Sequence, residues 1–320
     1  MPRKLQLGLI GTGLAPRHLY LPAFRALGRR IDLVACTNRT RAKAEEYAGL
    51  AGIPVVHDTT EELLADPSVE AVMISLPIDT APRYVLAALK AGKAVMTEKP
   101  NAANTAAAKR LLASAARYDA PYLVGENYAF MSHAHQLARW VAQGRLGDLR
   151  TVEVRDYTVM DKGQPWFHTS WRHDPAHVGG FVVDAGVHLA HVLREVVGDP
   201  VEVRGLSALQ EPDLGPVDTI AVALRFESGA LGTWSSCFSA PLEGPKIRIT
   251  GTKGVASWTP QSAELVSASG RVTRAELKED SFTGQFRHFA DVVVSGAEPL
   301  VTPADTLGDL ALMERLVKGR

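Results

Sequence analysis

The chain has 320 residues, of which 46% are hydrophobic, and its 35 Lys and Arg balance 35 Asp and Glu. This length predicts two domains with full apolar cores, and zero net charge argues against nucleic acid or an anionic membrane surface as the partner. No apolar run reaches transmembrane length, and no signal peptide precedes the first predicted strand. We therefore expect a cytoplasmic protein, with Cys36 and Cys237 as buried structural thiols in a reducing compartment.

The first half of the chain alternates short apolar strands with helical segments. Strands are predicted at Leu5–Ile10, Ile31–Thr37, Val55–His57, Ala71–Ser75, Ala94–Thr97 and Tyr122–Gly125. Helices are predicted from the turn after the first strand to about Leu27, at Thr40–Leu50, in a short segment opened by Thr59–Glu62, at Thr80–Lys90 and at Ala102–Tyr118. The alternation predicts an α/β Rossmann domain, a doubly wound parallel sheet, over residues 1–123.

The second half is richer in strands. Helices are predicted at His133–Gln143, at Val182–Val197 and after Thr302, where Pro303 takes the first helical position. Strands are predicted at Leu149–Thr158, Val201–Ser207, Ile220–Phe226, Ala230–Phe238 and Lys246–Thr250. Residues 124–320 are therefore predicted to form an α+β domain built on a mostly antiparallel sheet.

A glycine turn joins the first strand to the first helix. In Gly11-Thr12-Gly13-Leu14, the first glycine permits a tight turn and the second lets the backbone approach a pyrophosphate at the start of the helix. Pro16 replaces the third glycine of the usual fingerprint, although proline is tolerated in a first helical turn. The turn predicts a bound dinucleotide.

The residues after the second strand bear on which dinucleotide is bound. NAD-dependent enzymes commonly place Asp or Glu there to accept a hydrogen bond from the ribose 2′-hydroxyl, but this chain has Asn38 and Arg39. Arg39 can neutralise a 2′-phosphate, and Arg41 adds positive charge nearby. NADP(H) is therefore favoured, with NAD(H) possible. The alternative is that Arg39 and Arg41 only begin a solvated helix.

A polar stripe runs along the predicted helix in the second half. Asp184, His188 and His191 fall on one helical face, whereas most surrounding residues are apolar. Buried Asp and His need partners or a water-filled cleft, and an acid–imidazole pair there can transfer protons. The alternative is a structural hydrogen bond.

These motifs together resemble one family. Gly8–Gly13, Glu98-Lys99-Pro100, Trp171-Arg172, Gly179-Gly180 and Asp184–His188 stand in the order seen in the glucose–fructose oxidoreductase and inositol dehydrogenase family. The resemblance covers essentially the whole chain. It implies a Rossmann domain, a second domain with a large open sheet for substrate binding and oligomerisation, and NAD(P)-dependent hydride transfer to or from sugars, polyols or related hydroxy and carbonyl compounds.

The resemblance also implies residue roles. Lys99, Asp184 and His188 match the catalytic lysine, acid and histidine, with His188 as general base or acid and Lys99 stabilising a developing alkoxide. The substrate would contact these three together with His168, Trp171 and Arg172. Arg172 is expected to hold a substrate oxygen, a cofactor group or an interdomain carboxylate. The predicted cofactor-binding residues are Gly11, Thr12, Gly13, Leu14, Asn38, Arg39, Ser75, Pro77, Glu98, Lys99 and Asn127.

The sequence leaves open a metal site and two other functions. Five histidines between His168 and His191 raise a metal site, but the resemblance explains the same residues, so we expect no metal. An NAD-dependent glycosidase of the same fold and a non-catalytic NAD(P)-binding regulator are the two rival functions. We expect a small-molecule substrate and a homodimer or homotetramer paired through the sheet of the second domain.

Overall fold

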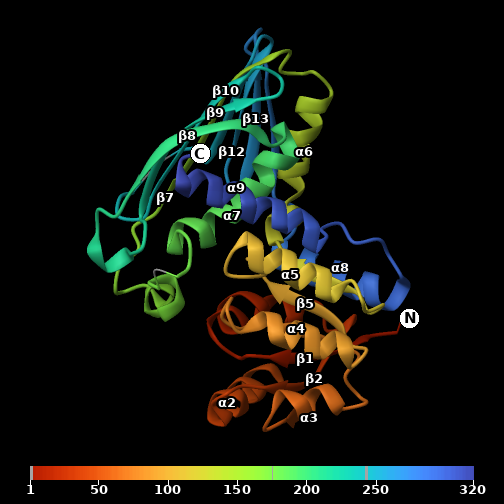
Figure 1. Ribbon diagram of the computed structural model, residues 1–320. Helices are drawn as coiled ribbons and strands as arrows, with labels where there is room; N and C mark the ends of the chain where they lie inside the picture. The colour runs from red at the N-terminus through yellow and green to blue at the C-terminus, as the bar shows by residue number, and fades with distance from the viewer. Residues whose placement is uncertain (1–2, 175, 242–243) are drawn as a thin grey trace. The chain divides into compact units, whose positions relative to one another are not determined.

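The computed structural model describes residues 3–174, 176–241 and 244–320, and the chain divides into two compact units (Figure 1). Unit 1 comprises the chain up to Phe130 together with Asp280–Leu307, and unit 2 comprises Met131–Glu279 and Gly308–Arg320. Each unit has its own β-sheet. Each unit therefore has its own framework for positioning functional side chains.

Unit 1 is a Rossmann fold, as predicted. Its sheet A has six parallel strands in the order β3-β2-β1-β4-β5-β6. The strands are β1 (Leu5–Ile10), β2 (Ile31–Thr37), β3 (Val55–Val56), β4 (Ala71–Ile74), β5 (Ala94–Glu98) and β6 (Tyr122–Gly125). Because all six run the same way, their carboxyl ends meet at one edge, where ligands of such sheets bind.

Helices cover both faces of sheet A. On one face, Tyr20, Phe24 and Tyr47 from the first helices pack with Phe286 and Phe289; on the other, Leu63, Val85, Leu89 and Leu111 form a second core. The helices are a π-helical turn η1 (Pro16–Tyr20), α1 (Leu21–Ala26), α2 (Arg41–Ala51), α3 (Thr60–Ala65), α4 (Ala81–Lys90), α5 (Thr105–Ala115), the 3₁₀ turn η2 (Asn127–Phe130) and α8 (Ser281–Ser295).

Unit 2 carries an eight-stranded sheet B in the order β14-β13-β12-β11-β7-β10-β9-β8. All neighbours in it are antiparallel except β7 and β10. The strands are β7 (Leu149–Tyr157), β8 (Pro200–Ala208), β9 (Thr219–Phe226), β10 (Leu231–Cys237), β11 (Ile247–Gly251), β12 (Gly254–Trp258), β13 (Ser262–Ser267) and β14 (Val272–Glu276). The mostly antiparallel sheet confirms the predicted fold class.

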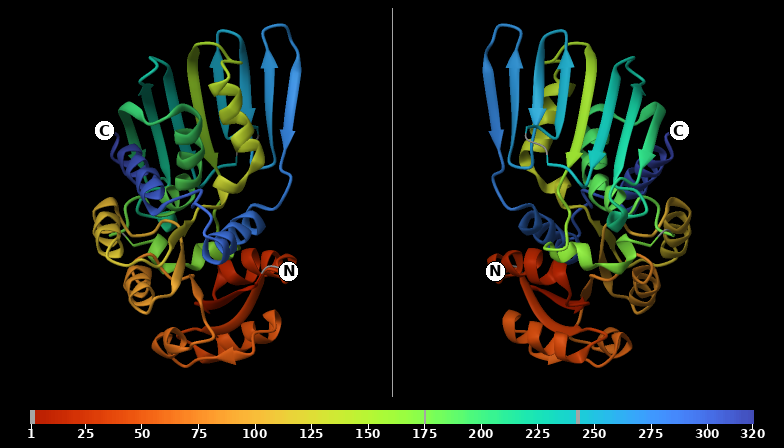
Figure 2. Two further views of the ribbon diagram at one scale, coloured as in Figure 1. Left: turned by 90° about the vertical axis from the view of Figure 1, so that its right-hand side faces the viewer. Right: turned by 90° about the vertical axis from the view of Figure 1, so that its left-hand side faces the viewer.

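Helices lie on one face of sheet B, and the strands of the other face are open to view (Figure 2). They are α6 (Ser132–Ala142), α7 (Gly180–Val197) and the part of α9 (Pro303–Lys318) that belongs to unit 2, with short 3₁₀ turns η3 (Pro165–His168), η4 (Ser170–Arg172) and η5 (Pro212–Leu214). Burial alternates strictly along β9, where Ile220, Val222, Leu224 and Phe226 are buried and Ala221, Ala223 and Arg225 are exposed. This alternation is typical of an antiparallel sheet with one solvated face.

Three sequence-based predictions need correction. The helix predicted at Ala102–Tyr118 spans only Thr105–Ala115, because the Asn104 side chain caps it by accepting a hydrogen bond from the Ala107 amide at 2.9 Å. Strands β12 to β14 were not predicted. Helix α8 was also missed, although Asp280 caps it through the Thr283 amide. No helix among the described residues is both long and apolar enough to cross a membrane.

Candidate active site

The glycine turn at the end of β1 has the form that a bound pyrophosphate requires. Gly11 has φ +93°, and a Cβ added to it would lie 2.3 Å from the Ser75 carbonyl oxygen at the end of β4. Gly13 is exposed, and nothing lies within 4 Å of the position its Cβ would take. Thr12 is buried and donates from its hydroxyl to the Lys43 carbonyl at 3.1 Å. A side chain would thus clash at Gly11 and fill the open space beside Gly13.

Tyr47 contacts the first helical turn at Pro16, which stands in place of the third glycine. Pro16 begins the π-helical turn, and the Tyr47 hydroxyl donates to the Pro16 carbonyl at 3.2 Å. Burial raises the pKa of Tyr47 to about 12, so the hydroxyl remains a donor at neutral pH. The first helical turn is therefore tied to α2 by a side-chain hydrogen bond.

The end of β2 presents an amide and an unpaired cation. The Asn38 Oδ1 accepts from the Thr12 amide at 3.4 Å, which links this strand end to the glycine turn. Arg39 is exposed and forms no ion pair with another described residue. Arg41, in contrast, is held by Glu45 at 2.8 Å and by Asp58. Of the two arginines, only Arg39 has a guanidinium that is not already neutralised by a carboxylate.

The ends of β4 and β5 complete this edge of sheet A. Ser75 is half-buried and donates its amide to the Ile10 carbonyl at 2.9 Å, while Pro77 is exposed. Lys99 is half-buried directly after β5, and its amide donates to the Glu98 carboxylate at 3.1 Å. Since β1, β4 and β5 are neighbours in the sheet, these residues share one edge with the glycine turn.

Two buried amides follow β5 and β6. Asn127 is 5% exposed, and its Nδ2 donates to the Ser281 hydroxyl of α8 at 2.7 Å. Asn101, two residues after Lys99, is 1% exposed, and neither end of its carboxamide has a protein partner among the described residues. The sequence analysis did not single out Asn101. Its only signal was a polar residue directly after the Glu-Lys-Pro motif.

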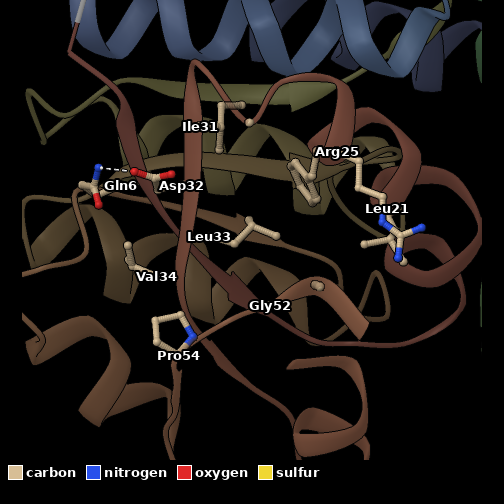
Figure 3. Close-up of a pocket in the computed structure, with 12 residues that line it drawn as sticks. Gln6, Leu21, Arg25, Ile31, Asp32, Leu33, Val34, Gly52 and Pro54 are labelled. Atoms are coloured by element: carbon tan, nitrogen blue, oxygen red, sulfur yellow. Dashed lines mark hydrogen bonds between the residues drawn. The ribbon is translucent and has the colours of Figure 1, made fainter. Parts of the chain in front are cut away.

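The residues of unit 1 fit a dinucleotide. The glycine turn leaves space for phosphates, Asn38 and Arg39 stand where the ribose end of a dinucleotide binds in this fold, and Lys99 follows the fifth strand. A separate cavity of about 440 Å³ is lined by Gln6, Arg25, Asp32 and Val34, with Gly52 and Pro54 (Figure 3). This cavity lies beside the first half of β2, away from the carboxyl ends of the strands. None of the predicted binding residues lines it.

In unit 2, α7 carries the predicted polar stripe. Asp184, His188 and His191 are half-buried along one side of a helix whose other residues are mostly buried and apolar. His191 contacts the buried Asp309 carboxylate of α9 through Nδ1 at 2.9 Å, and Arg194 pairs with the same carboxylate at 2.6 Å. His191 is therefore part of a contact between two helices of unit 2.

Asp184 has a close cationic partner. The Arg172 Nε and Nη2 both lie near the Asp184 Oδ2, at 2.9 and 2.8 Å, and the Arg172 Nη1 donates to the Thr169 hydroxyl at 2.6 Å. The guanidinium carbon is 4.3 Å from the ring centre of Trp171 and 5.6 Å from that of Trp166. The carboxylate that Arg172 holds belongs to its own unit, whereas the sequence analysis named an interdomain carboxylate, a substrate oxygen or a cofactor group.

The other candidate substrate residues lie in the segment before α7. His168 is exposed, and its Nε2 donates to the Lys162 carbonyl at 2.8 Å. Trp171 is half-buried and meets the His177 ring edge-on at 6.0 Å. Among the residues that the structure describes, no three His, Cys, Asp or Glu side chains gather as a set that could hold a metal ion.

Comparisons with known proteins match both halves of the chain. Residues 5–126 match the family model described as an oxidoreductase family with an NAD-binding Rossmann fold, and residues 134–257 match the GFO/IDH/MocA C-terminal domain. Dehydrogenase FPY6 of Fusarium mangiferae is 30% identical over 97% of this chain and 95% of its own length. A 1,5-anhydro-D-fructose reductase of Ensifer adhaerens is 31% identical, over 77% of this chain and 73% of that protein. The crystal structure of an oxidoreductase from Thermotoga maritima has a TM-score of 0.93 at 31% identity, covering 99% of this chain and 97% of the other.

Proposed function

The chain belongs to the GFO/IDH/MocA family of oxidoreductases, and on that premise we propose that it transfers a hydride between NADP(H) and a sugar, polyol or related hydroxy or carbonyl compound. The observation that carries the proposal is the half-buried pair Asp184 and His188 on one face of the otherwise apolar α7. The pair matches the acid and histidine that the family resemblance implies. The reductase named for 1,5-anhydro-D-fructose supports a sugar-like substrate.

NADP(H) is the proposed cofactor. No carboxylate follows β2 to accept from a ribose 2′-hydroxyl or to repel a 2′-phosphate, and the exposed Arg39 guanidinium is available to such a phosphate. Gly11, Thr12, Gly13 and Leu14 would hold the pyrophosphate. Ser75, Pro77, Glu98, Lys99 and Asn127 would border the rest of the cofactor.

Each proposed catalytic residue has one task. The nicotinamide, when bound, supplies or accepts the hydride. His188 takes the hydroxyl proton when an alcohol is oxidised and returns it when a carbonyl is reduced. The Lys99 ammonium stabilises negative charge developing on the substrate oxygen. Asp184 accepts a hydrogen bond from a substrate hydroxyl.

Turnover with a substrate panel tests the function. Purified protein is mixed with NADP⁺ or NAD⁺ and a panel of aldoses, polyols and glycosides, or with NADPH or NADH and the matching carbonyl compounds, while the absorbance of the reduced cofactor and the release of free sugar are followed. Turnover with at least one member is expected. Release of a sugar from glycosides without net cofactor change would instead indicate the glycosidase. Tight cofactor binding without turnover of any compound would indicate the regulator.

We further propose that the protein assembles through the open face of sheet B. The strand register places Leu231, Thr151, Thr250, Val255, Val266 and Val272 in one row across this face. Leu231 is 55% and Val272 50% exposed, and Leu206 of β8 is 80% exposed. A row of apolar and small side chains on a broad sheet favours pairing with the same face of a second copy.

The two free, buried cysteines support a reducing compartment, the cytoplasm.

A further inference from the structure

The contact between Arg172 and Asp184 is unusually complete for an ion pair near a helix start. Two nitrogens of the guanidinium lie on one carboxylate oxygen, the third nitrogen donates to Thr169, and the plane lies near two indole rings. The side chains are only 10% and 13% exposed. Every nitrogen of Arg172 therefore has an assigned partner within unit 2, and the positive charge is balanced by Asp184 alone among the described contacts.

The local backbone is built to make this contact. Gly179 and Gly180 begin α7 with φ +76° and +45°, values that side-chain-bearing residues rarely adopt. A Cβ on Gly180 would lie 2.4 Å from the Arg172 carbonyl oxygen. The two glycines let the 3₁₀ turn that carries Arg172 approach the first turn of α7, and Asp184 is one turn further along the same helix.

The surroundings make the pair costly to separate. In a site with this little exposure, removing one member leaves a charge without compensation, which costs more than an exposed ion pair contributes. A carboxylate held by an arginine also strongly favours its ionised form. Asp184 is thereby fixed as a hydrogen-bond acceptor, which leaves proton transfer to His188.

The guanidinium is correspondingly unavailable to an anionic substrate. A free arginine in a substrate site is the usual means of binding a carboxylate or phosphate, but here its fork is filled by Asp184 and Thr169. An acid would have to displace Asp184 from a buried contact. A neutral hydroxyl compound has only to donate a hydrogen bond to the carboxylate.

We propose that Arg172 is a positioning residue that fixes Asp184 as an ionised, oriented acceptor, and that this site consequently takes an uncharged polyhydroxy compound rather than its acid. The proposal rests on the proposed function. It assigns Arg172 a role through Asp184 rather than through direct contact with the substrate.

A double-mutant cycle tests the role. We expect Arg172→Met to lower kcat/KM by about a hundredfold, the scale of a misplaced catalytic group, and Arg172→Lys to recover part of the loss because it retains a cation. The Asp184→Asn/Arg172→Met double variant should be no worse than Asp184→Asn alone. If the losses of kcat/KM in the two single variants multiply in the double variant, the two residues act independently and the proposal is overturned. A wild-type preference for an aldonic acid over the matching neutral sugar would also overturn it.

A matched control separates this role from general stabilisation. Arg194 is another paired arginine on the same helix, held by Asp309 and Asp199. Arg194→Met should lower the free energy of unfolding and leave kcat/KM near the wild-type value. A loss of kcat/KM as large as that of Arg172→Met would show that any broken ion pair on α7 has this effect, and would overturn the assignment.

Sulfate binding supplies a readout that needs no turnover. Asp184→Asn leaves the guanidinium without its carboxylate, so sulfate should raise the melting temperature of this variant more than that of the wild type or of the double variant. Equal shifts in all three would show that Asp184 does not neutralise Arg172, and the proposal would fail. Absence of turnover in the wild type with the expected sulfate pattern would instead refute the proposed function and leave the charge pairing intact.

Discussion

Cofactor selectivity depends on one exposed side chain, and Arg39→Ala measures it. Arg39 follows β2 and forms no ion pair with another described residue, so a 2′-phosphate would not have to displace a carboxylate from it. A hydrogen bond to a charged group contributes about 1.5–3 kcal/mol, and exposure to solvent places this contact at the lower end. About 1.4 kcal/mol corresponds to a tenfold change in affinity. We therefore expect Arg39→Ala to weaken NADPH binding by about tenfold and to leave NADH binding unchanged.

Fluorescence titration of the two reduced cofactors provides the measurement, and Arg41→Ala is the matched control. Arg41 lies two residues further along but is already held by Glu45 and Asp58, so its removal should change NADPH binding less. An equal loss of NADH affinity in Arg39→Ala would show that the side chain supports the fold of the strand end rather than a phosphate. Wild-type protein that binds NADH as tightly as NADPH would refute the reasoning altogether.

Three further predictions concern catalysis, acid stability and assembly. His188→Ala should lower kcat by about a hundredfold or more while NADPH affinity stays the same; near-normal turnover would remove His188 as the proton-transfer residue and redirect attention to His168. Burial lowers the pKa of His133, whose Nε2 donates to the Thr259 carbonyl and whose Nδ1 has no hydrogen-bond partner among the described residues. The unfolded chain then binds the proton first, so the free energy of unfolding should fall as the pH drops below about 6.5, and urea titrations should show a smaller fall in His133→Phe. Sedimentation should show a dimer or tetramer at micromolar concentration and a monomer for Thr233→Arg on the open face of sheet B; a monomeric wild type would contradict the proposed interface.

The Rossmann unit was predictable because its signals are local. Each strand is a short apolar run, and the predicted β1, β2 and β6 agree with the structure residue for residue. Helix α8, in contrast, could not be placed from local signals in the sequence. Its Phe286 and Phe289 are spaced for one helical face, but they pack on Tyr20 and Phe24, more than two hundred residues earlier in the chain. Nothing in the sequence around α8 indicates which sheet it covers.

The missed strands of sheet B have a different cause. In β13 and β14, polar residues such as Ser262, Glu264 and Arg274 alternate with a few apolar ones, because one face of these strands is solvated. Such short, half-polar strands resemble loops when examined alone. They become strands through pairing with β12, which in turn pairs with β11. These segments therefore become strands because each pairs with a neighbouring strand, and not because its own residues strongly favour a β conformation.

The sequence nominated residues for the candidate site one by one, but it did not predict the contacts that the structure shows among them. Spacing alone placed Asp184 and His188 on one helical face, and it left the partner of Arg172 open among three possibilities. The decisive information is the positive φ of Gly179 and Gly180, which brings the Arg172 turn against the start of α7. The Trp-Arg, Gly-Gly and Asp-x-x-x-His motifs therefore act as one structural device rather than three. The first supplies the cation and its aromatic support, the second the close approach, and the third the carboxylate, so a substitution of Arg172, Gly179, Gly180 or Asp184 disturbs the same ion pair.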